Sequence, residues 1–517
     1  MADLSAAIAD EEVLAGAKNH RRSRPDTGTG SEHEPRGVGG SWVWAALGLA
    51  GSALVTLAGS RLATGGAITW WFSALGSSAS ANTVALYAGM LLLALAWLGL
   101  GRSMRTHPLA PARLYLIGTA WALPLALGPA LFSKDVYSYL ALGTLLHLGL
   151  NPYHVAPSVL AGLGHGHVLA TVSPFWRHTT APYGPLFVGL SGLIVSVTGS
   201  HLIAGVLLIR LSELAGLVLA AAFLPRLARA LGSDPARAIW FALLSPLTLL
   251  ELVAAGHNDA LMVGLLLAGV TLALEGRPLL GIVLCAVAAT IKLPALAGAV
   301  FIAVAWSRTV SPPAERVRFA AYATVLGLAT IAALSALSGV GSGWLSTGVF
   351  STPARVHLAI TPATALGWTV ASLLRDVGIG AGTRAVEDGL GVASSVLVAV
   401  GALALLWRVR VTTLVPYLAA VLLLAAAGGP AAWPWYLTWG LVLMAGVPGA
   451  QRSRALALAI VASVFLVKAD GILALPLQSA PFVLGAYAVI AVLAWRAWGR
   501  PNAGGRGPIL ANPAVDW

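Results

Sequence analysis

The sequence of 517 residues contains few charged side chains. Asp, Glu, Lys and Arg make up 10% of it, whereas soluble domains carry about a quarter. A chain with so little charge lacks the polar surface that a water-soluble fold of this length needs. The shortage of charge therefore predicts an integral membrane protein.

Cysteine is nearly absent as well. The single cysteine, Cys285, lies within an apolar run, which excludes a disulfide within the chain and a metal site built from cysteines. The sequence also contains no glycine-rich loop of the kind that cradles nucleoside triphosphates. An activated substrate would therefore arrive already attached to a lipid.

Apolar residues dominate what is present. They make up 58% of the chain, and the mean hydropathy is +0.84. Apolar runs of about the length that crosses a bilayer as a helix recur along the chain. They lie near residues 42–60, 84–101, 111–131, 184–199, 203–224, 238–254, 259–274, 279–306, 319–338, 389–407, 412–427, 435–447, 453–468 and 481–498. We therefore predict an all-α, polytopic membrane helix bundle of roughly 12–15 transmembrane helices.

The basic residues set the expected topology. The formal net charge of +12 comes mostly from arginines in short clusters between the apolar runs, which argues against a nucleic-acid partner and is typical of cytoplasmic loops. Residues 1–40 are predicted to form a disordered cytoplasmic tail, 41–500 the membrane domain, and 501–517 a cytoplasmic C-terminal tail. Two long loops, about 132–183 and 339–388, then come out on the extracytoplasmic side of the plasma membrane.

Helix parity and loop charge disagree between residues 184 and 306. We favour a topology in which one of the runs 184–199 and 203–224 does not span, and in which 279–306, interrupted by Pro294, forms two segments. The alternative keeps full spans and leaves one basic loop outside. Both topologies place the two long loops on the same side.

The first long loop opens with an acid directly after a predicted helix. Asp135 follows Lys134 and precedes Tyr137. A carboxylate at the membrane boundary beside hydroxyls suits a general base that deprotonates a sugar hydroxyl. The alternative is an interfacial acid that pairs with Lys134. The next stretch, 140–150, is amphipathic enough to lie along the membrane surface.

A second polar cluster stands between two apolar runs. His257, Asn258 and Asp259 are consecutive, and polar groups at membrane depth are costly unless they face a cavity or one another. Lys292 is a lone cation in an apolar stretch and needs a carboxylate or a ligand phosphate as its partner. Two interpretations stay open: Asp259 and Lys292 pair to hold the helices together, or they serve a substrate.

Other polar and aromatic residues have a structural interpretation first. Arg210 and Glu213, three apart on one apolar helix, are predicted to form an intramembrane pair. His165 and His167 are assigned to a solvated loop rather than to a metal site. The tryptophan-rich segment 433–439 is typical of an interfacial belt; a platform on which sugar rings stack is the alternative.

These clusters, in this order, resemble the GT-C superfamily of lipid-linked-sugar glycosyltransferases. Within it they resemble the actinobacterial polyprenol-phosphate-mannose-dependent α-1,6-mannosyltransferases, the MptB-like proteins. The resemblance covers residues 41–500 and rests on six segments: 133–139 (SKDVYSY), 149–153 (GLNPY), 183–186 (YGPL), 256–261 (GHNDAL), 291–294 (IKLP) and 433–439 (WPWYLTW).

The resemblance implies a multi-pass enzyme with an extracytoplasmic active site. It would transfer mannose from polyprenyl-phosphate-mannose to a lipid-anchored mannan, the core of lipomannan and lipoarabinomannan, in α-1,6 linkage. A β-linked donor and an α-linked product require inversion and one base, for which Asp135 is the candidate. Such families often carry two acids in this loop, and this sequence has one. The departure weakens the expectation of a bridged divalent metal ion, which stays open as a cofactor with no ligand assigned.

The resemblance also implies roles for other residues. The anionic leaving group is expected to meet cations, namely Lys292, Lys134 and Arg355. The residues expected to position the substrates are Tyr137, Asn151, Tyr153, Tyr183, His257, Asn258, Asp259, Trp435 and Tyr436. The rival prediction is a multi-pass transporter or flippase for a lipid-linked or sugar substrate, which also holds ionisable residues in the membrane but predicts internal repeats.

Overall fold

A computed structural model describes residues 39–63, 78–199, 201–345, 361–379, 382–429, 433–472 and 479–498. Within these ranges the chain is built from helices and contains no β-strand, which confirms the all-α prediction. The predicted tails at 1–40 and 501–517 lie outside the described residues, except that α1 begins at Gly39.

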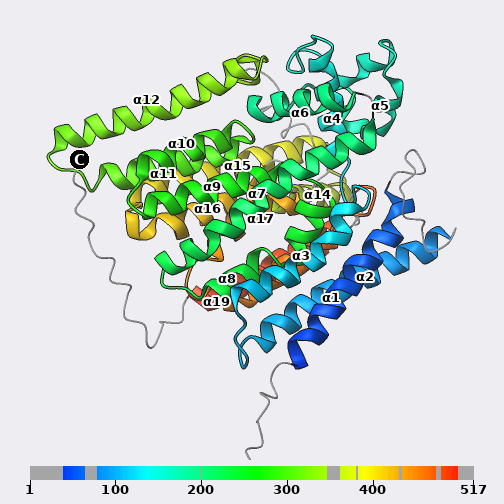
Figure 1. Ribbon diagram of the computed structural model, residues 1–517, viewed down its shortest axis with the longest axis horizontal. Helices are drawn as coiled ribbons and strands as arrows, with labels where there is room; N and C mark the ends of the chain where they lie inside the picture. The colour runs from blue at the N-terminus through cyan, green and yellow to red at the C-terminus, as the bar shows by residue number, and fades with distance from the viewer. Residues whose placement is uncertain are drawn as a thin grey trace, which may run out of the picture.

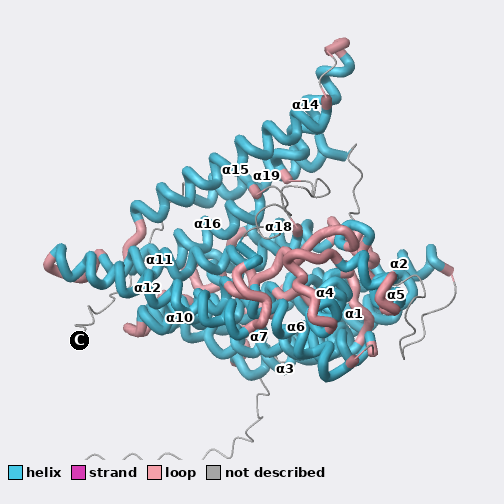
Figure 2. The backbone as a smooth tube through the Cα atoms, turned by 90° about the horizontal axis from the view of Figure 1, so that it is seen from above, coloured by secondary structure: helices cyan, strands magenta, loops and turns pink. Residues whose placement is uncertain are grey.

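The helices form one bundle, in which α1 and α2 lie side by side at one edge, α12 runs along the opposite edge, and α7, α9 and α10 pack together between them (Figure 1). From above, α14 and α15 extend away from the body (Figure 2). The bounds are α1 Gly39–Leu62, α2 Ala79–Ser103, α3 Pro111–Leu127, α4 Asp135–His147, α5 Gly166–Thr171, α6 Pro185–Thr198, α7 Leu202–Ala230, α8 Pro235–Ala242, α9 Asp259–Leu274, α10 Pro278–Ala289, α11 Leu296–Ser307, α12 Pro313–Leu337, α14 Pro362–Asp376, α15 Thr383–Arg408, α16 Leu414–Gly428, α17 Leu437–Met444, α18 Arg454–Val464 and α19 Ala480–Trp498.

Proline marks where many of these helices begin. Its fixed φ suits the first helical position, and its missing N–H would have no partner there in any case. The prolines at helix starts are Pro111, Pro185, Pro235, Pro278, Pro313 and Pro362. Within the predicted run 279–306, Pro294 interrupts the helix instead of starting one. The run breaks there into α10 and α11, as expected.

Helix lengths bear on the predicted topology. Within the described ranges, six helices are long and apolar enough to cross a membrane, or up to seven if a bent pair counts as one span. Helix α6 has 14 residues and α7 has 29, so only α7 reaches the length of a full span. This agrees with the favoured topology, in which one of these two segments does not cross. The predicted 12–15 spans require that shorter apolar helices cross as well.

The first long loop contains a buried helix. Helix α4 is buried from residue 135 to residue 145 and packs against α6 and α7. The expectation that 140–150 lies along the membrane surface is therefore wrong for most of this stretch. Within this helix, the hydroxyl of Thr144 donates to the Leu140 carbonyl at 2.8 Å.

A broken helix carries the second polar cluster. The π-helical turn η3 (Thr248–Ala254) and α9 meet at an angle of 115°. Gly256 adopts φ +71° at the break, a left-handed conformation that glycine adopts without steric cost. The break aims His257 and Asn258 into the protein, where both are fully buried.

Glycines let the central helices approach one another closely. A Cβ on Gly264 of α9 would lie 2.1 Å from the carbonyl oxygen of Gly216 of α7, and a Cβ on Gly269 would lie 2.7 Å from the carbonyl oxygen of Gly281 of α10. Membrane helices associate through such close packing because the lipid is as apolar as their side chains. Helix α9 is thereby fixed between its two neighbours.

Replacing Gly264 by Leu is expected to separate α7 from α9 and to destabilise the fold by at least about 1–3 kcal/mol, the range for overpacked interiors. The measurement is the thermal midpoint of the purified protein in detergent. The matched control is Gly389→Leu, because no atom lies within 4 Å of a Cβ built there. Equal midpoints for the two variants would contradict this packing.

Candidate active site

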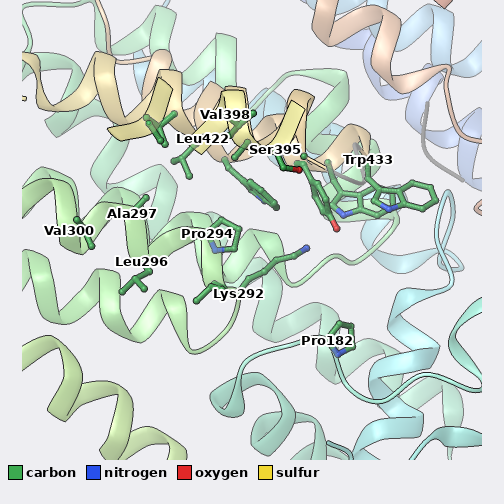
Figure 3. Close-up of a pocket in the computed structure, with 18 of the residues that line it drawn as sticks. Pro182, Lys292, Pro294, Leu296, Ala297, Val300, Ser395, Val398, Leu422 and Trp433 are labelled. Carbon is green, nitrogen blue, oxygen red and sulfur yellow. The ribbon is translucent and has the colours of Figure 1, made fainter. Parts of the chain in front are cut away.

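A cavity of about 590 Å³ opens between α11, α15, α16 and the 433–439 segment. One part is lined by aliphatic side chains of the three helices, and the other by polar and aromatic groups. Figure 3 shows Lys292 reaching toward Trp433 past Pro294, with Leu422 and Val398 on the opposite wall. The residues of the polar part are Asp135, Trp176, Tyr183, Lys292, Trp433, Trp435, Tyr436 and Trp439. We call this the first cavity.

The backbone before Asp135 is held from two sides. Leu131 donates its N–H to the carbonyl of Ala254 at 3.1 Å, and Phe132 donates to the carbonyl of Ala469 at 2.9 Å. Phe132 adopts φ +65°, a backbone conformation that residues other than glycine rarely adopt. Such strain persists where the surrounding structure enforces it, and it is frequent at functional sites. These contacts fix the direction in which α4 begins, and Asp135 is its first residue.

Two donors hold the Asp135 carboxylate. The indole N–H of Trp176 donates to one oxygen at 3.0 Å, and the hydroxyl of Tyr183 donates to the other at 3.2 Å. Burial and the nearby Asp135 carboxylate raise the pKa of Tyr183 well above its ordinary value, so its hydroxyl keeps its proton. The N-terminus of α4 also favours a negative charge at this position. The carboxylate is 11% exposed and reaches the first cavity.

Lys292 forms the second charged group of the site. Its ammonium donates to both oxygens of Asp259, at 2.8 and 3.0 Å, and lies 4.6 Å from the centre of the Tyr436 ring. The indole of Trp439 also donates to Asp259. Asp259 is fully buried, whereas the Lys292 side chain is 12% exposed and lines the first cavity. The pair therefore joins α9 to the α10–α11 break and still presents the cation to the cavity.

His257 lies between the two charged groups and is fully buried. Its Nδ1 is 2.7 Å from the carbonyl oxygen of Glu251, and because a carbonyl only accepts, Nδ1 carries the proton. The other nitrogen, Nε2, faces an oxygen of Asp135 at 4.0 Å. The ring stacks on Trp435 with centres 3.9 Å apart. His257 therefore supports the aromatic wall from behind and lies beside Asp135 without donating a hydrogen bond to it.

The structure brings together part of the predicted site. Five of the predicted residues line the first cavity: Asp135, Tyr183, Lys292, Trp435 and Tyr436. His257 and Asp259 contact these residues from behind. Three others do not line the first cavity: Asn151 donates to the Val340 carbonyl beyond α12, Tyr153 donates to the Tyr183 carbonyl, and Tyr137 is buried. Arg355 lies outside the described residues.

One predicted ion pair is not formed, and neither is the pair of Lys134 with Asp135 that stood as an alternative. Arg210 does not pair with Glu213; its guanidinium donates instead to the carbonyls of Ala126, Gly128, Pro129 and Ala254. The last carbonyls of a helix lack partners within it and attract a cation, and these lie at the ends of α3 and η3. Lys134 forms no ion pair with Asp135 and lines a separate, second cavity.

Sequence reasoning missed several residues of the site. Trp176 donates to Asp135 but lies in a polar loop. The only sequence signal for it is a large aromatic side chain among small polar residues. Trp439 and Trp433 belong to the aromatic segment but had no individual assignment. Glu251 was hidden within an apolar run. In the described ranges, no group of three or more His, Cys, Asp or Glu side chains stands close enough to hold a metal ion.

Known proteins are similar to this chain over most of its length. A family model described as alpha-(1->6)-mannopyranosyltransferase, N-terminal domain, matches residues 36–308. Alpha-(1->6)-mannopyranosyltransferase A of Mycobacterium tuberculosis is 35% identical over 388 residues, 73% of each chain. A probable alpha-(1->6)-mannopyranosyltransferase of Mycolicibacterium smegmatis is 34% identical over 427 residues, 74% of each chain. No solved structure matches this chain.

The matched region contains Asp135, the buried Lys292–Asp259 ion pair and the broken helix that carries His257. A second alpha-(1->6)-mannopyranosyltransferase of Mycobacterium tuberculosis is 32% identical over 416 residues, 69% of each chain. The similarity thus extends beyond the region of the family model. The chain therefore belongs to the alpha-(1->6)-mannopyranosyltransferase family.

Proposed function

We propose that this protein transfers mannose from polyprenyl-phosphate-mannose to a lipid-anchored mannan, with inversion, at the extracytoplasmic face of the plasma membrane. The names of its relatives support an α-1,6 linkage in the product. One observation carries the proposal: a single cavity has apolar walls along three helices and ends at a cation and a carboxylate. A lipid-linked sugar phosphate matches this order: its lipid chain suits the apolar walls, its phosphate suits the cation, and its sugar lies beyond the phosphate, near the carboxylate.

The apolar part of the first cavity suits a polyisoprenoid chain. Its walls come from α11, α15 and α16, through aliphatic side chains such as Val300, Leu403 and Leu422. An ammonium has three N–H donors, and Lys292 uses two of them on Asp259. The third is available for a phosphate oxygen of the donor. The cation would then stabilise the phosphate as it leaves.

The reaction needs one base and no covalent intermediate. The acceptor hydroxyl transfers its proton to Asp135 as its oxygen bonds to the anomeric carbon of mannose. The bond from that carbon to the phosphate oxygen breaks, and the electron pair leaves with the lipid phosphate. Trp176 and Tyr183 hold the base in position, and general base catalysis of this kind contributes roughly 10²–10⁴-fold.

Family membership favours an enzyme over the rival transporter or flippase. Asp135 and Lys292 converge on one cavity whose apolar walls fit a lipid, as a membrane-bound transferase requires. The extracytoplasmic placement rests on the predicted topology, in which the first long loop follows the third helix. It also fits a donor whose activation comes from a lipid phosphate rather than from a nucleotide.

Replacing Asp135 by Asn is expected to lower the rate of mannose transfer by roughly 10²–10⁴-fold, because Asn cannot accept the proton. Transfer is measured with purified protein in lipid nanodiscs, radiolabelled polyprenyl-phosphate-mannose and a short mannoside. The matched control is Asp376→Asn, which removes an exposed charge at the end of α14. Transfer by D135N at the rate of this control would exclude Asp135 as the base.

A paired substitution separates the two roles of Lys292. Lys292→Met alone leaves Asp259 buried without a cation and is expected to destabilise the fold by about 3–5 kcal/mol. Adding Asp259→Asn removes that charge and keeps an acceptor for Trp439, so the thermal midpoint should return toward that of the wild type. The donor KM of the double variant should stay raised by roughly tenfold or more. Full recovery of transfer along with stability would mean that the pair is only structural.

A further inference from the structure

A second cavity, of about 260 Å³, meets the first one at the base. Asp135, Trp176, Trp433 and Trp435 line both cavities. Lys292 lines only the first cavity, and Lys134 lines only the second. The remaining residues of the second cavity are Ser133, Ser173, Pro174, Phe175, Asp470, Gly471 and Ile472.

The two cavities differ in chemistry. The first extends along apolar helices, whereas the second is lined by loop residues that carry hydroxyl, ammonium, carboxylate and aromatic groups. The side chain of Phe175 is 52% exposed although it is apolar. Trp433 and Trp435 stack with centres 4.9 Å apart at 13°. Because Trp435 also stacks on His257 and is only 5% exposed, Trp433 is the one of the two that can offer a ring face to a ligand. A pyranose, with one apolar face and a rim of hydroxyls, matches these walls better than a lipid chain does.

Tertiary contacts place the outer wall of the second cavity against the base. Gly471 adopts φ +83°, and a Cβ there would lie 3.1 Å from the Cα of Ser133. Asp470 accepts the N–H of Ile472 at 3.1 Å through one carboxylate oxygen, which leaves its other oxygen available. The turn at 468–472 is thus fitted onto the segment that leads into α4.

An unsatisfied donor also faces this region of the protein. Trp435 is 5% exposed, and its indole N–H has no hydrogen-bond partner among the described residues. Buried polar groups are rarely left unpaired. A sugar hydroxyl bound beside the shared wall would accept this hydrogen bond.

The stereochemistry of inversion requires two sites on opposite sides of the anomeric carbon. The acceptor oxygen bonds to that carbon on one face while the phosphate oxygen leaves from the other, and the acceptor proton goes to the base. Because Lys292 lines the first cavity alone and Asp135 stands at the junction, the acceptor hydroxyl comes from the second cavity. Resting on the proposed function, we propose that the second cavity binds the terminal mannose of the acceptor glycan, with Phe175 and Trp433 stacking on the ring and Asp470 accepting hydrogen bonds from its hydroxyls.

The test uses the full-length protein in nanodiscs with radiolabelled polyprenyl-phosphate-mannose and a short α-1,6-linked mannoside. Phe175→Ala and Asp470→Asn are each expected to raise the acceptor KM by roughly tenfold while the donor KM stays within about twofold. Hydrolysis of the donor by water, without acceptor, should be unchanged. Phe482→Ala is the control, because Phe482 is 81% exposed and lines neither cavity.

The reciprocal variant is Ala402→Trp, which fills the apolar part of the first cavity. It is expected to raise the donor KM and to leave the acceptor KM unchanged. The assignment is overturned if Phe175→Ala and Asp470→Asn leave the acceptor KM at the wild-type value, or if they raise the donor KM alone.

Direct binding separates this inference from the proposed function. Saturation-transfer NMR measures binding of the mannoside without any donor, and F175A and D470N should weaken it roughly tenfold. Wild-type protein that binds the mannoside in this way but transfers nothing from polyprenyl-phosphate-mannose would refute the proposed donor and retain the acceptor site. Mannoside binding that is unaffected by both substitutions would refute the acceptor site.

Discussion

Charged groups buried in a membrane bundle need partners, and the Lys292–Asp259 pair is where this requirement shapes the protein most. Each charge lies on a different interrupted helix, one at the start of α9 and the other at the break between α10 and α11. Their contact, supported by the indole of Trp439, ties both breaks to the aromatic segment. Breaking the pair would leave an uncompensated buried charge, so the two breaks keep a fixed relative position.

Arg210 fixes the position of Asp135 in a comparable way. Its guanidinium joins carbonyls at the end of α3 to the carbonyl of Ala254, and Leu131 donates to that same carbonyl. The short segment from α3 to α4 is thereby held against the broken helix. Asp135 begins α4 directly after this segment. The position of its carboxylate therefore depends on a buried cation that is far from it in sequence.

The two cavities follow from this frame. The broken helices bring Lys292 to one side of the aromatic wall, and the start of α4 brings Asp135 to the junction. The apolar cavity and the polar cavity share Trp176, Trp433 and Trp435. In the proposed reaction, one carboxylate would then serve a hydrophobic donor and a hydrophilic acceptor.

The sequence by itself determined the membrane class, the all-α fold and many helix bounds, because apolar length and proline placement act locally. The run 259–274 coincides with α9, and the break at Pro294 was expected. It also marked Lys292, a lone charge in an apolar stretch, and Asp135, an acid directly after a predicted helix. Only the tertiary structure decided their partners. Arg210 binds helix-end carbonyls rather than Glu213, Lys134 forms no ion pair with Asp135, and Trp176 donates to Asp135. Such contacts depend on how the whole bundle packs, because they join residues that are distant in sequence.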